Sequence, residues 1–177
     1  MSPSWSKEPE GEVLLDFVWF DHAEEIGQLV CAWARVEHEI DEAIWKLAGV
    51  EENPGACMTA QISNVARRFD ALFALARLRQ TPPELLRDLE KVKNEALKLA
   101  ALRNRVVHDP WASSYTSLDD KKHYRLEVTA RSKLDFRYKE VPTDALKRIT
   151  ESIKKLHERL HRAVGELDRA YWSSLEI

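Results

Sequence analysis

The spacing of apolar residues constrains the fold of this chain most strongly, because they recur every three or four positions along four long stretches. In the first stretch they are Ile26, Leu29, Val30, Trp33, Val36, Ile40, Ala43, Ile44 and Leu47. This spacing places the apolar side chains on one face of an α-helix and the polar side chains on the other. Four such helices must bury their apolar faces together, which predicts an antiparallel helical bundle.

Local signals give the expected bounds of the first two helices. Asp21, with Glu24 three residues later, has the form of a capping box at a helix start. Gly49 is a natural end for this helix, because glycine readily adopts the left-handed conformation found there. Asn53-Pro54-Gly55 is expected to be a turn. A second amphipathic helix is expected over about 59–79.

The second half of the chain changes its periodicity. Thr81-Pro82-Pro83-Glu84 predicts the start of a third helix, with Thr as cap and Pro in the first turn, and Pro110 ends this helix. Residues 111–122 read as a polar loop. Apolar and polar residues then alternate over 124–138, which predicts a β-hairpin turning near Ser132-Lys133. A last long helix is expected after Pro142-Thr143.

Length and composition set the class of protein. The 177 residues suit one domain, expected over 13–177, after a mobile polar tail over 1–12. The net charge of −3 excludes a generally basic nucleic-acid coat protein, so any contact with nucleic acid has to be local. The two cysteines, with no CxxC spacing, favour a reducing cytoplasm. We expect neither a membrane segment nor a signal peptide.

The stretch from Leu102 to Trp111 contains the candidate catalytic residues. On a helical wheel Arg103 falls in the centre of the apolar stripe, between Leu99 and Val106, and Glu37 falls in the centre of the first stripe. A charged side chain at a core-facing position is costly unless it is paired with an opposite charge or reaches a water-filled groove. The two residues could therefore share a cleft, or form a buried structural ion pair.

Asn104 and His108 lie four residues apart, on one flank of the same helix. A guanidinium can hold phosphate oxygens, and an imidazole can transfer a proton near neutral pH. Alternatively, His108 is a helix-end histidine that bonds a free carbonyl.

The run Arg103-Asn104-Arg105-Val106-Val107-His108 resembles the Arg-Asn-x-x-x-His motif of the HEPN superfamily, and Trp33 and Glu37 on an early helix are similar to the layout of uncharacterised bacterial members. The resemblance implies a mainly-α, HEPN-like bundle with a small β-hairpin before the last long helix. It also implies a metal-independent endoribonuclease that works as a homodimer, in which the two motifs face each other. Some relatives extend the motif to His-x-Tyr, where the tyrosine is nucleotidylated; Pro110 stands there in this chain, so that modification is not expected.

The same resemblance implies roles for the motif residues. Arg103 would bind the scissile phosphate, His108 would be the general acid or base, and Asn104 would orient one of them. The product would be a 2′,3′-cyclic phosphate. A toxin or antiviral-defence effector is the expected setting, with an antitoxin as a possible partner and no cofactor or metal.

Further residues are candidates for supporting roles. Glu37 would support the site, and Trp111 would stack a base or seal a dimer interface, with core packing as its alternative. Arginines on or beside the second helix, with one in the motif, could follow an RNA backbone, although a solvated face is the alternative. These arginines are Arg67, Arg68, Arg77, Arg79 and Arg105.

Two hypotheses from other classes stay open. The chain could be a catalytically silent HEPN-like interaction or nucleic-acid-binding module, in which Arg103 and Glu37 are structural. Alternatively, His157-Glu158-Arg159-Leu160-His161 matches the H-E-x-x-H pattern of zinc peptidases. No third ligand follows this pattern at a suitable spacing, so we expect a solvated helix face there.

Overall fold

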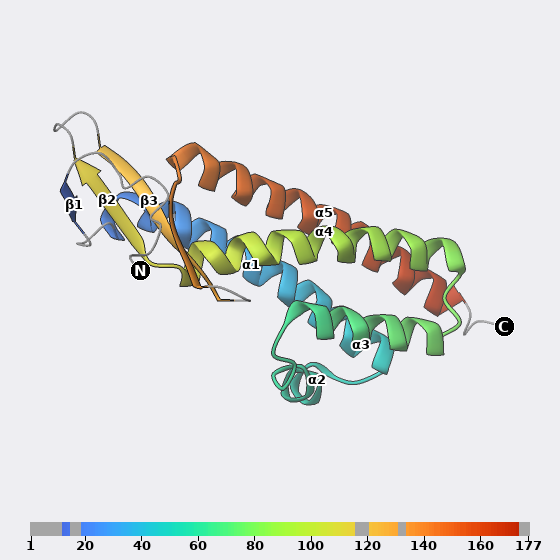
Figure 1. Cartoon of the computed structure of the whole chain (residues 1–177). Coiled ribbons are helices and arrows are strands. Elements are labelled where there is room, and N and C mark those ends of the chain that lie inside the picture. Colours follow the sequence, from blue (N-terminus) through green and yellow to red (C-terminus); the bar gives the residue numbers. More distant parts are fainter. Residues whose placement is uncertain (1–11, 15–18, 116–120, 131–133, 174–177) are drawn as a thin grey trace. The chain divides into compact units, whose positions relative to one another are not determined.

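The computed structural model of the chain describes residues 12–14, 19–115, 121–130 and 134–173 (Figure 1). The described part is mainly helical, as predicted. Its helices are α1 (Trp19–Ala48), α2 (Glu52–Thr59), α3 (Val65–Leu78), α4 (Pro83–His108) and α5 (Thr143–Ser173). Its strands are β1 (Glu12–Leu14), β2 (Trp111–Tyr115), β3 (Lys121–Ala130) and β4 (Leu134–Glu140). None of the described helices combines the length and apolar character needed to cross a bilayer.

The described residues fall into two compact units, and the boundaries between them lie within α1, α4 and α5. The sheet unit contains the described residues of 1–30 and 101–150, and the helical unit contains those of 31–100 and 151–177. The prediction of one domain over 13–177 stays a prediction. The predicted mobile tail over 1–12 lies outside the described residues, except for Glu12, which is the first residue of β1.

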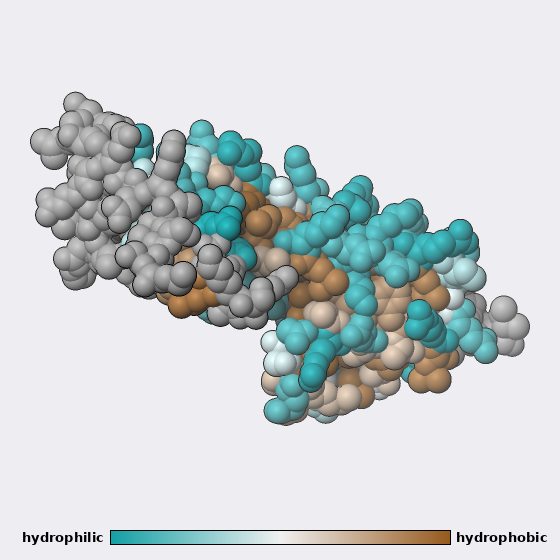
Figure 2. All heavy atoms as spheres, viewed as in Figure 1, coloured by the Kyte–Doolittle hydropathy of each residue, from teal (hydrophilic) through white to brown (hydrophobic). Residues whose placement is uncertain are grey.

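The core of the helical unit consists of the predicted apolar stripes. Fully buried side chains come from α1, α3, α4 and α5, among them Ile40, Phe69, Leu89 and Leu156. Figure 2 shows the consequence on the viewed face, where hydrophobic residues gather around α3 and α4 and hydrophilic residues line the outer rim along α5. Burial of these large side chains is the main favourable term for folding, at roughly 1.5–3 kcal/mol for each one.

The directions of the helices follow from short connections and ion pairs. Residues 79–82 alone connect α3 to α4, so these helices run antiparallel, with Asp70 and Lys93 paired at 2.7 Å between them. α5 also runs antiparallel to α4 (Figure 1), and Arg159 pairs with Glu95 between these two helices. The antiparallel arrangement predicted from sequence thus holds for both pairs. α1 runs in the same direction as α5.

The structure corrects three helix bounds. α1 begins at Trp19, so Asp21 lies within the first turn and is not the N-cap. Residues 53–55 are not a turn but part of α2, because proline fits the first turn of a helix, where no backbone donor is required. The helix predicted over 59–79 begins only at Val65, where the Asn64 side chain accepts a hydrogen bond from the Arg67 backbone at 2.9 Å. Gly49 ends α1 as predicted, with a φ of 70°.

The sheet unit contains a four-stranded antiparallel sheet in the order β1-β2-β3-β4. The predicted hairpin is confirmed as β3 and β4, with Leu126 opposite Tyr138, while the turn predicted near 132–133 lies outside the described residues. The polar loop predicted over 111–122 is wrong at 111–115 and 121–122, which form β2 and the start of β3. Short polar strands carry little periodicity of their own, and β2 is a strand because it pairs with β1 and β3.

Candidate functional site

The end of α4 carries the predicted motif in the sheet unit. Arg103 is half-buried, and its neighbours along the stripe, Leu99 and Val106, are 7% and 1% exposed. The guanidinium of Arg103 donates from Nη1 to Oδ1 of Asn104 at 3.0 Å, while its buried Nε has no hydrogen-bond partner among the described residues. Asn104 is exposed. The prediction that Arg103 interrupts the buried stripe is therefore confirmed, and Asn104 is its polar partner.

His108 is the last residue of α4 and is exposed to solvent. Among the described residues, none forms a hydrogen bond, ion pair or ring contact with its imidazole. A histidine that only capped the helix would bond a carbonyl of the last turn. His108 makes no such bond to the described residues, and its side chain is exposed.

Two hydrogen bonds to backbone carbonyls hold the helix end that carries His108, and we call them the clamp. The indole nitrogen of Trp111 donates to the carbonyl of Val106 at 2.9 Å, which satisfies one of the free carbonyls of the last turn. The backbone N–H of Leu126 donates to the carbonyl of Pro110 at 2.8 Å, which joins the segment to β3. The backbone on both sides of His108 is therefore held in place by hydrogen bonds.

Side-chain charges add a second connection between α4 and β3. Arg125 on β3 is 5% exposed, and its Nε lies 3.2 Å from Oδ2 of Asp109, the residue after His108. Arg125 also pairs with Glu127, and Arg105 of α4 approaches both carboxylates, at 3.8 Å from Asp109 and 3.6 Å from Glu127. Sequence reasoning missed Arg125, because a lone arginine in a strand gives no signal of its partner on a distant helix.

These contacts set the ionisation of Glu127. Burial of its carboxylate opposes ionisation, but the hydrogen bond and charge of Arg125, followed by the charges of Arg105 and Lys139, outweigh burial. The pKa of Glu127 consequently lies below its ordinary value, and the carboxylate stays charged at neutral pH.

A buried histidine lies against the same clamp. His22 of α1 is 1% exposed, and its ring centre is 4.2 Å from that of His123 and 5.3 Å from that of Trp111. Its Nε2 has no hydrogen-bond partner within the described part of the chain. Burial is the main cause that lowers the pKa of His22, against the opposing charge of Glu25 and a hydrogen bond with the backbone of Val141. No local sequence pattern indicates this cluster, because its members come from separate elements.

The other predicted site residues are dispersed. Glu37 is half-buried in the helical unit, so its predicted pairing with Arg103 stays a prediction. Trp111 is half-buried and serves the clamp described above. Arg67 is exposed, whereas the guanidinium of Arg68 is held by Asp41 of α1. Roles in RNA binding for these arginines stay predictions.

The H-E-x-x-H pattern lies in the helical unit. His157 and His161 both contact Glu39 of α1, at 3.4 Å and 3.0 Å. Within the described part of the chain, no group of three or more His, Cys, Asp or Glu side chains is arranged to hold a metal ion. The arrangement therefore lends no support to the zinc-peptidase hypothesis, and the two histidines connect α5 to α1 through one carboxylate.

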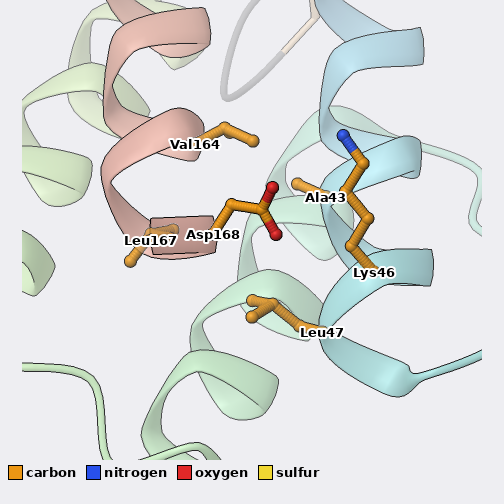
Figure 3. A pocket seen from close by; sticks show the side chains of 6 residues that line it. All are labelled: Ala43, Lys46, Leu47, Val164, Leu167 and Asp168. Atoms are coloured by element: carbon orange, nitrogen blue, oxygen red, sulfur yellow. The ribbon is translucent and has the colours of Figure 1, made fainter. Parts of the chain in front are cut away.

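Two hollows in the helical unit have little capacity for a ligand. One lies between α1 and α5, where Asp168 points from α5 toward α1 (Figure 3). Its volume of about 10 Å³ is room for roughly one water molecule. The other is an open groove of about 220 Å³ between α4 and α5, with lining residues of both charges. Neither hollow includes a residue of the predicted site.

Comparisons with protein-family models, with curated proteins and with solved structures found no match to this chain.

Proposed function

We propose that this protein is a metal-independent endoribonuclease of the HEPN type, with Arg103, Asn104 and His108 as its catalytic residues. The observation that carries the proposal is the end of α4, where an exposed imidazole without a described partner follows a half-buried guanidinium on the same helix. The end of α4 thus carries an anion-binding group, Arg103, and a proton-transfer group, His108, on one helix.

The chemistry needs no further component. RNA supplies its own nucleophile, the 2′-hydroxyl, which attacks the neighbouring phosphorus while the 5′-oxygen leaves. The products are a 2′,3′-cyclic phosphate and a 5′-hydroxyl. Arg103 would neutralise charge on the phosphate, and His108 would remove the 2′-hydroxyl proton or deliver one to the leaving oxygen. Asn104 would hold the guanidinium in place through the 3.0 Å hydrogen bond that it already accepts.

The proposal includes an assembly and a setting. In a homodimer with the two motifs facing each other, one His108 would act as base and the other as acid. A toxin or defence effector in the cytoplasm, restrained by an antitoxin, is the setting that the motif favours.

The test is cleavage of single-stranded RNA in the presence of EDTA. We expect the wild-type chain to cleave and to leave 2′,3′-cyclic phosphate ends, and His108→Ala to lower the rate about 100-fold or more, as expected for loss of a general acid or base. Arg103→Ala should have a comparable effect. His38→Ala is a matched control, since His38 is an exposed histidine of α1 outside the site.

A second candidate is the catalytically silent module. The hydrogen bond from Arg103 to its own neighbour Asn104 favours it, because a guanidinium committed to its own helix can be structural. A folded wild-type chain that leaves a broad panel of RNAs intact would decide for this candidate. Activity that disappears on addition of EDTA would contradict the metal-independent mechanism.

A further inference from the structure

A group of cations lies on the sheet next to the end of α4. We call it the basic edge; it consists of Arg105 on α4, Arg125 on β3, and Arg137 and Lys139 on β4. Arg105, Arg125 and Lys139 all approach Glu127, at 3.6 Å for Arg105 and 4.0 Å for Lys139. Arg137 stands directly opposite Glu127 in the β3–β4 register. The contacts thus join the motif helix to the edge strand of the described sheet.

The described side chains of the basic edge carry an excess of positive charge. Three cations, Arg105, Arg125 and Lys139, approach the two carboxylates of Asp109 and Glu127, and the buried Arg125 already contacts both. The remaining cations reach solvent, with Arg105 40% and Lys139 64% exposed, and Arg137 exposed as well. The excess is local, because residues 121–140 contain seven Lys and Arg against three Asp and Glu, in a chain whose net charge is −3.

The position of this charge relative to the motif suggests its ligand. Arg105 lies three residues before His108, so the two side chains are neighbours on the surface of α4. Lys139 extends the positive charge from that helix to β4 through their shared contact with Glu127. A polyanion bound at His108 would therefore meet Arg105 first and Lys139 next.

We propose that the basic edge binds the phosphates of single-stranded RNA that flank the scissile linkage, with Lys139 and Arg105 as the contacting residues. This inference rests on the proposed ribonuclease function. A single strand is favoured because its backbone can bend around a helix end and onto a sheet edge, and because proteins bind single strands with positively charged surfaces that follow the backbone. An acidic protein segment is the competing ligand, and the test includes it.

The experiment measures binding separately from cleavage. Fluorescence anisotropy with a 2′-O-methylated single-stranded RNA, which has no free nucleophile, reports affinity over a range of salt concentrations. We expect Lys139→Gln and Arg105→Gln each to weaken binding about 3- to 10-fold and to reduce the slope of log affinity against log salt by about 0.7, as for loss of one phosphate contact on a single strand.

Lys122→Gln is the matched control. Lys122 is an exposed lysine of β3, but its position in the strand alternation places it on the opposite face of the sheet from Glu127. It should bind the RNA within twofold of wild type. Equal effects of Lys122→Gln and Lys139→Gln would overturn the inference, as would binding of a poly-glutamate peptide in preference to the RNA.

The two proposals fail in different ways. Binding that depends on Lys139, without cleavage of unmodified RNA, would reject the ribonuclease and keep the RNA surface. Cleavage that depends on His108, with unchanged binding and KM in Lys139→Gln, would keep the ribonuclease and reject the surface. Arg137→Gln provides a second variant if Lys139→Gln is poorly folded, because Arg137 occupies the same face of β4.

Discussion

At the scale of single residues, Gly55 of α2 packs directly against the Trp45 ring of α1. A Cβ atom added to Gly55 would lie 2.5 Å from Cγ of the Trp45 ring. The ring cannot retreat easily, because it is buried and its Nε1 donates to Oγ1 of Thr59 at 3.1 Å. We therefore expect Gly55→Ala to lower the free energy of unfolding by about 1–3 kcal/mol, the usual cost of overpacking.

Chemical denaturation measures this difference, and Gly27→Ala is the control. Gly27 lies within α1 and has nothing within 4 Å of an added Cβ, so alanine there should be neutral or stabilise by up to about 1 kcal/mol. If Gly55→Ala unfolds at the same denaturant concentration as wild type, α2 does not pack on Trp45 as described.

The same residues mark what the sequence could and could not predict. Arg103 was placed in the buried stripe from its helical phase alone, because α4 is long and regular. Asn53-Pro54-Gly55 was read as a turn, because these three residue types favour turns when nothing else contacts them. The contact of Gly55 with Trp45 joins two elements, so no local pattern could reveal it.

At the scale of elements, we predict that the stability of the first turns of α1 depends on the protonation state of His22, which is buried there. Its pKa lies below that of an unfolded histidine, chiefly through burial, so the folded chain binds fewer protons than the unfolded chain in this range. As the pH falls below the ordinary histidine value, protonation favours the unfolded state. A charge on His22 would also face the His123 and Trp111 rings and the Thr143 hydroxyl, which lie closest to it.

The prediction is a loss of stability as the pH falls from 7.5 to 5, and a smaller loss in His22→Asn. The free energy of unfolding, measured by denaturant titration at each pH, provides the test. His38→Asn, which removes an exposed histidine from the same helix, should retain the wild-type pH dependence. A pH dependence that is identical in wild type and His22→Asn would show that His22 does not control it.

Elements differed in how far the sequence predicted them. Pro110 predicted where α4 ends, and Pro142-Thr143 predicted where α5 begins, because proline acts locally on the backbone. The strand β2 was missed, since its pairing with β1 joins positions about a hundred residues apart. The ion pair at the end of α4 could not be predicted for the same reason. Asp109 pairs with Arg125 of β3, and local patterns predict that strand but not the helix that it contacts.

At the scale of the whole molecule, the proposed mechanism needs two proton-transfer groups, and each chain supplies one motif histidine. In the proposed homodimer, His108 of the second chain supplies the other group. The protein should therefore have twice the 20.5 kDa mass of the chain in solution, as measured by light scattering.

A mixing experiment tests whether the two motifs share one site. Arg103→Ala and His108→Ala should each be inactive alone, but after subunit exchange about half of the dimers would contain one chain of each kind. Such a mixed dimer keeps one Arg103 and one of the two His108 side chains at the shared site. Neither variant alone has both kinds of group, so part of the cleavage activity should return, although the rate should stay below that of wild type because one of the two proton-transfer groups is missing. If each chain instead contained a complete site, activity should not return, because neither variant would supply both groups. A mixture that is dimeric but inactive would therefore show that the whole reaction takes place within one chain.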